Sequence, residues 1–224
     1  MKSAEAILAA ELKKLGFQRK GRRILYTRKN DIIGLIAFER PTSILYLQFA
    51  IVPLFLPCPG FIGFSFGNRL ESMGFGLPTI TKESTEEEID EFCWEAMWHI
   101  QGDLIPFMEQ MSTATALCEF SKNGIRPFRR RYTKYIFCNP EQLRQLYLYS
   151  SLYSHDYQGA LDAAEKHISY VKKIKYYSKE LKARKIGESE MLVSTIKNEE
   201  YARIDEMLKQ NIEENLSLFS GGKR

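Results

Sequence analysis

Residues 41–68 read PTSILYLQFAIVPLFLPCPGFIGFSFGN and contain no charged side chain. A transmembrane helix needs about 20 apolar residues with every backbone group bonded inside the segment, so length alone would allow one here. Three prolines between positions 53 and 59 interrupt the segment, and each internal proline costs a helix about 3 kcal/mol. We therefore predict buried strands at Ile44–Val52 and Phe61–Phe66, and no membrane insertion.

The residues before this segment predict the rest of a sheet. Lys2–Leu15 carries apolar residues at helical spacing and is expected to be a helix. Arg23–Arg28 and Ile32–Glu39 are typical of strands, with a tight turn between them. The result is an antiparallel meander of about four strands, in which Gly34 suggests a bulge.

Two helices are expected after the sheet. Thr85–Gln101 begins with a capping box and continues with apolar residues at positions typical of one helix face. A further helix is predicted from about Asp103 to Gly124, with a proline in its first turn. Together with the first helix, these elements could cover one face of the sheet.

The pattern after residue 124 is helical. One capped helix starts at Asn139, a second follows Asp156 and could continue to Ile186, and a last helix contains Met191 and Phe219. We therefore predict an α+β fold: an α+β domain at residues 1–124, followed by an all-helical bundle at 125–224. The boundary is soft, and the two parts could form one fused unit. The second apolar face of the sheet also needs a cover, which the C-terminal helices could supply.

Charge is distributed unevenly along the chain. Residues 1–120 hold 12 Lys and Arg against 15 Asp and Glu, whereas residues 121–224 hold 20 against 13. A basic and aromatic segment follows the boundary; its candidate binding residues are Arg126, Arg129, Arg130, Arg131, Tyr132 and Lys134. Such a segment could contact phosphates while its rings stack on bases, or it could dock on the acidic helix within the chain.

Trp94 and Trp98 are candidates for a second interface. They lie four residues apart on the helix face opposite the apolar stripe, among glutamates. Tryptophans on a nominally wet face indicate a contact surface. We expect the C-terminal helices to cover them, with Arg129–Lys134 near the surrounding acidic residues.

No motif for catalysis, for a cofactor or for a metal is visible. The sequence has no glycine-rich phosphate loop and no nucleophile elbow, and its four cysteines form no C-x-x-C pair. His99, which has Glu95 and Asp103 nearby in the sequence, is the one histidine worth testing as a base. We expect no catalytic residues, and a cytoplasmic location with reduced thiols.

Residues 15–21 (LGFQRKG) follow a helix and lead into the strands. In this respect residues 5–120 resemble the start of the bacterial family called domain of unknown function 4304. Other members typically carry a polar Gln-Ser-type step in the second strand, where this chain has residues 38–41 (FERP). The resemblance implies a bacterial cytoplasmic protein without an assigned activity.

Residues 151–161 (SLYSHDYQGAL) are similar to the turn and second helix of a tetratricopeptide unit. In such units an Asp-Tyr pair precedes a small residue that lets two helices pack closely. Arg144 lies near the position where the first helix of a unit usually has an aromatic residue. One unit is visible, and at least three are normally needed for a stable array, so a generic helical hairpin is the alternative.

These patterns favour a protein–protein interaction module without catalysis in the bacterial cytoplasm. The alternative is anion or nucleic-acid binding through Arg126–Lys134. A third function is an immunity-type protein that neutralises a toxin.

Overall fold

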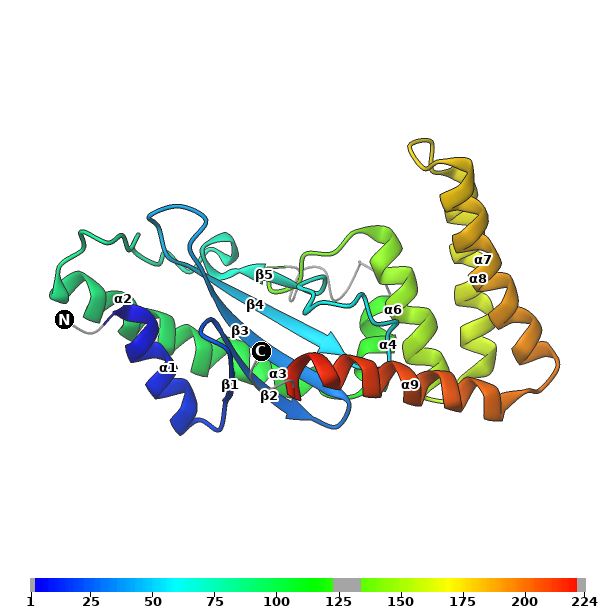
Figure 1. Ribbon diagram of the computed structural model, residues 1–224, viewed down its shortest axis with the longest axis horizontal. Helices are drawn as coiled ribbons and strands as arrows, with labels where there is room; N and C mark the ends of the chain where they lie inside the picture. Colours follow the sequence, from blue (N-terminus) through cyan, green and yellow to red (C-terminus); the bar gives the residue numbers. More distant parts are fainter. Residues whose placement is uncertain (1–2, 123–133, 221–224) are drawn as a thin grey trace.

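The computed structural model describes residues 3–122 and 134–220 of the chain. It confirms an α+β fold, in which an antiparallel meander is followed by packed helices (Figure 1). The sheet has five strands in the order β1-β2-β3-β4-β5. Their bounds are β1 Gln18–Lys20, β2 Ile24–Lys29, β3 Ile32–Glu39, β4 Tyr46–Pro53 and β5 Gly67–Arg69.

The sheet differs from the prediction at its two edges. Short β1 pairs with β2 and adds a strand that the sequence pattern did not show. The predicted strand at Phe61–Phe66 is wrong, because pairing with β4 begins only at Gly67. Phe61 is exposed and Phe66 is buried, and a left-handed glycine, Gly60, turns the chain just before them.

Gly34 causes no bulge, contrary to the expectation. It pairs in regular register with Thr27 on one side and with Ile51 on the other. A Cβ atom built on Gly34 would lie 2.5 Å from the sulfur atom of Met108. Glycine at this position therefore allows a helix to approach the middle of the sheet.

The helices are shorter than predicted. Their bounds are α1 Ala4–Lys14, α2 Glu86–His99, α3 Ile105–Gln110, α4 Ala114–Lys122, α6 Pro140–Tyr153, α7 Tyr157–Lys173, α8 Lys179–Lys197 and α9 Tyr201–Ser220. The helix expected at Asp103–Gly124 is two helices, and a π-helical turn at Ile100–Leu104 joins α2 to α3. The continuation to Ile186 is also wrong, since α7 ends at Lys173. The predicted last helix is divided into α8 and α9.

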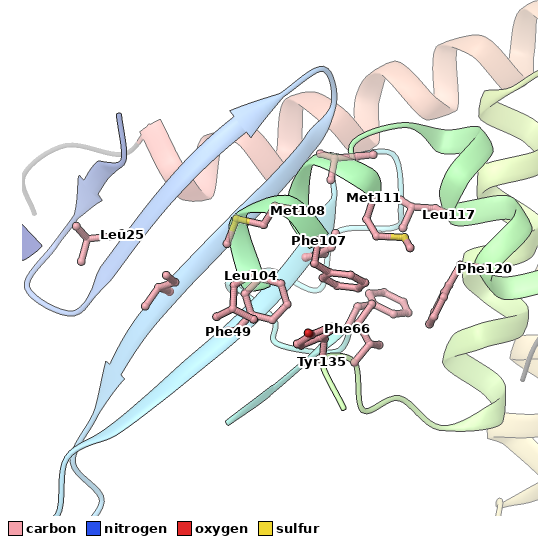
Figure 2. Packing of buried hydrophobic residues seen from close by; sticks show 14 of the residues in the cluster. Leu25, Phe49, Phe66, Leu104, Phe107, Met108, Met111, Leu117, Phe120 and Tyr135 are labelled. Atoms are coloured by element: carbon pink, nitrogen blue, oxygen red, sulfur yellow. The ribbon is translucent and has the colours of Figure 1, made fainter. Parts of the chain in front are cut away.

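Helices α1, α2 and α3 cover one face of the sheet (Figure 1). Figure 2 shows Leu104, Phe107 and Met108 beside Phe49 of β4. The rings of Phe49 and Phe107 meet edge to face, with their centroids 5.9 Å apart. The same core continues through α4 into helices α6–α9, so apolar contacts run through both halves of the chain.

Helix α9 covers the second face, as expected of a C-terminal helix (Figure 1). Phe219 packs on this face with its ring centroid 5.0 Å from that of Tyr26. The amide of Asn215 donates hydrogen bonds to the backbone carbonyls of Leu54 and Leu56, each at 2.8 Å. Thus α9 also holds the middle of the charge-free segment. No helix in residues 3–122 and 134–220 is long and apolar enough to cross a bilayer.

A buried polar cluster joins α6, α7 and α8. The Lys185 ammonium lies 2.6 Å from the Glu141 carboxylate, and the Tyr177 hydroxyl donates to the same group. His167 Nδ1 lies 2.9 Å from the hydroxyl of Ser189. Burial lowers the pKa of His167 below its ordinary value, although the nearby Glu141 acts in the opposite direction.

Gly67→Ala tests how closely β4 and β5 approach each other. The added Cβ would lie 1.9 Å from the backbone oxygen of Phe49 and 2.6 Å from Ala50 Cα. Because backbone atoms cannot move aside as a side chain can, we expect a loss of about 3 kcal/mol in a urea unfolding experiment. The control is Gly102→Ala, where a Cβ meets nothing within 4 Å. Equal stability of the two variants would contradict this pairing.

The buried histidine predicts a pH dependence of stability. The pKa of folded His167 lies below the unfolded value of 6.5, so its contribution is full above 6.5 and is lost as pH falls through the folded pKa. His167→Gln should flatten the fall in melting temperature between about pH 7 and 5. The control is His155→Asn, which removes an exposed histidine at a left-handed position that Asn tolerates. A flattening of equal size in the control would contradict the assignment.

Candidate functional site

The outer face of α2 carries two stacked tryptophans. Trp94 and Trp98 are 66% and 65% exposed, and their ring centroids are 5.8 Å apart with an interplanar angle of 27°. Exposed Glu87, Asp90 and Glu91 lie on the same side, because 100° per residue places all five within one face. We call these five residues the acidic tryptophan ridge.

The opposite face of α2 explains how the ridge is presented. Ile89, Phe92 and Ala96 are buried in the core, so the helix cannot rotate without exposing them. The helix begins with a capping box. The Thr85 hydroxyl accepts a hydrogen bond from the backbone N–H of Glu88, and the Glu88 carboxylate accepts one from the backbone N–H of Thr85. Rigid presentation of two large rings lowers the entropy cost of a contact.

The negative charge of the ridge is not neutralised by its own segment. Residues 83–121 contain ten Asp and Glu and no Lys or Arg. No ion pair joins Glu87, Asp90 or Glu91 to a cation in the part of the chain that the structure describes. The positive end of the helix dipole stabilises acidic residues in the first turn. Glu91 lies beyond that turn and is not stabilised in this way.

A second group of polar side chains lies where α2 passes into the π-helical turn. His99 Nδ1 is 3.1 Å from an oxygen of Asp103, and the Tyr135 hydroxyl donates to the other oxygen at 2.9 Å. Burial raises the pKa of Asp103, but the hydrogen bonds from His99 and Tyr135 outweigh it, and the pKa lies below its ordinary value. Lys134 Nζ lies 4.0 Å from the same carboxylate.

This group fastens the end of the ridge. The ring of Phe75 stacks on His99 at a centroid distance of 4.0 Å, and Lys134 lies over Phe75 at 5.1 Å. One face of the His99 ring thus contacts Phe75, and its Nδ1 contacts Asp103. Because His99 follows Trp98 directly, these contacts also restrain the backbone that carries Trp98. The described ranges contain no group of three His, Cys, Asp or Glu side chains that could hold a metal ion.

The predicted site residues therefore separate into three sets. Trp94 and Trp98 lie together, but their expected cover by the C-terminal helices is wrong, because both are exposed. Lys134 lies 4.0 Å from Asp103, in the π-helical turn that follows the acidic helix α2. The remaining basic candidates lie outside the described residues, and nucleic-acid binding through them stays a prediction: Arg126, Arg129, Arg130, Arg131 and Tyr132.

Sequence reasoning missed Phe75 and Tyr135 as supports of the ridge. Tyr135 ends the basic and aromatic segment, and its hydroxyl reaches a carboxylate 32 residues earlier in the chain. Phe75 lies in an irregular stretch, where no periodic pattern shows which way a ring points. Only the tertiary fold brings Phe75 to His99 and Tyr135 to Asp103.

Comparisons with protein-family models, curated proteins and solved structures gave no match to this chain. The order of a helix, an antiparallel meander and C-terminal helical hairpins is present as the two resemblances imply. Membership of either family stays a prediction.

The exposure of the ridge predicts the fluorescence of the intact protein. Trp94 and Trp98 are the only two tryptophans in the chain, so they account for all of its indole emission. We expect a red-shifted emission maximum typical of water-exposed indoles, and ready quenching by acrylamide. Trp94→Phe and Trp98→Phe should each leave one accessible tryptophan. A blue-shifted, poorly quenched spectrum in the native protein would show that the ridge is covered.

Proposed function

We propose that the protein is a cytoplasmic protein-interaction module without catalysis, and that its acidic tryptophan ridge binds a basic segment of a partner protein. The observation that carries this proposal is the exposed, stacked pair Trp94 and Trp98 in a segment that has ten acidic residues and no Lys or Arg. The four cysteines are all free thiols, as suits a reducing compartment.

The chemistry of the ridge favours a partner rich in arginine. Indole faces attract a guanidinium group, and each such contact contributes about 0.5–1 kcal/mol at an exposed site. Glu91 and Glu87 lie about one and two turns before Trp94, so one extended basic segment could contact both the carboxylates and the rings. Tryptophan and arginine are also the residues that dominate protein interfaces energetically.

The shape of the site suits protein binding rather than catalysis. The tryptophans project into solvent from the exposed face of a helix, whereas small-molecule sites are concave and enclose most of their ligand. A toxin with a basic functional surface is one class of partner that fits, which would give the module an immunity-type role. The acidic charge would then also accelerate association by steering the partner.

The test is a titration with a fluorescein-labelled oligoarginine peptide, followed by anisotropy. We expect binding that weakens with salt, and a loss of about tenfold or more in affinity for Trp94→Ala/Trp98→Ala, because central interface aromatics commonly contribute about 2 kcal/mol. Glu87→Gln/Glu91→Gln should weaken binding and reduce its salt dependence.

The matched control is Glu190→Gln/Glu206→Gln, which removes the same charge from exposed positions on α8 and α9. It should leave the affinity nearly unchanged. Equal losses in the ridge variant and the control would mean that only net charge matters. If the peptide does not bind at low salt, the proposal that the ridge binds an arginine-rich partner is wrong.

A further inference from the structure

The turn between α7 and α8 forms a basic tip at the end of the molecule away from α2 (Figure 1). We define the basic tip as five lysines and one exposed tyrosine: Lys172, Lys173, Lys175, Tyr176, Lys179 and Lys182. Glu180 is the one acidic residue between positions 172 and 187. Positive charge is therefore concentrated where the hairpin projects farthest from the sheet.

The five lysines of the tip make no ion pair within the described residues, although other cations on α8 do. Arg184 lies 3.8 Å from Glu188, and Lys185 lies 2.6 Å from buried Glu141. Both pairs are farther along the helix. The lysines of the tip thus remain available to a ligand.

Stability of the helices explains only part of this distribution of charge. Lys172 and Lys173 lie in the last turn of α7, where the negative end of the helix dipole stabilises a cation. Lys179 and Lys182 lie in the first turns of α8, where a cation faces the positive end and is unfavourable. A bound anion would offset this repulsion.

An aromatic platform accompanies the lysines. Tyr176 is 80% exposed, and its ring meets that of Tyr177 edge to face at a centroid distance of 5.0 Å and an angle of 87°. Tyr177 is itself anchored, because its hydroxyl donates to Glu141 in the buried cluster. Tyr176 therefore offers a ring face to solvent from a supported position.

We infer that the basic tip binds single-stranded nucleic acid, whose phosphates contact the lysines while a base stacks on Tyr176. Proteins that bind single strands combine these two features, a positive surface along the backbone and aromatic rings under the bases. A lipid surface fits less well, because Ile174, the aliphatic residue of the turn, is buried and cannot enter a membrane.

The test is anisotropy of a fluorescein-labelled, mixed-sequence single-stranded RNA titrated with the full chain at several salt concentrations. Five phosphate contacts predict a slope of about −3.5 in a plot of log K against log salt, or roughly a hundredfold loss between 50 and 200 mM. Lys172→Gln/Lys175→Gln/Lys179→Gln should make the slope shallower by about 2. Tyr176→Ala should weaken binding about fivefold or more and leave the slope unchanged.

The matched control is Lys13→Gln/Lys29→Gln/Lys197→Gln, which removes three exposed lysines outside the tip. It should keep the native slope, and circular dichroism should show the same helix content in all variants. Equal slopes in the two triple variants overturn the inference. So does binding that is lost only in Arg129→Ala/Arg130→Ala/Arg131→Ala, or a tip that binds phosphatidylserine vesicles but no RNA.

Discussion

Burial of β3 on both faces is the constraint on which the rest of the structure depends. Seven of its eight residues are buried, with side chains alternating between the two sides of the sheet. Neither face can be left to water, so one layer of helices is not enough. Helices α1, α2 and α3 cover the first face, and the chain must return from its far end to place α9 on the second.

This return explains why the two halves of the chain share a core. Helices α6, α7 and α8 carry the chain away from the sheet, and α9 brings it back (Figure 1). Asn215 fastens α9 to the backbone of the charge-free segment by donating hydrogen bonds to two carbonyls, those of Leu54 and Leu56. The proline-rich stretch thereby provides a surface on which α9 packs, and does not only connect two strands.

The parts of the fold with regular periodicity could be predicted from the sequence. The strand Ile32–Glu39 and the capped starts of α2 and α6 are local patterns, set by alternation and by side chains that bind nearby backbone groups. The strand predicted at Phe61–Phe66 was wrong, because an aromatic segment forms a strand only where a neighbouring strand can pair with it. The exposure of Trp94 could not be predicted either, since an outward face can be free or covered and only tertiary packing decides which. The charges of the basic tip were visible in the sequence, but their gathering at one turn was not.

Closure of the sheet by α9 has a consequence for synthesis on the ribosome. Tyr26 leaves the ribosome long before Phe219, which packs against it. Until then, the second face of the meander has no helix over it, because this contact joins residues far apart in the sequence. The nascent chain therefore carries an apolar sheet surface from the synthesis of the meander until α9 has left the ribosome, and such transiently exposed surfaces are prone to aggregation.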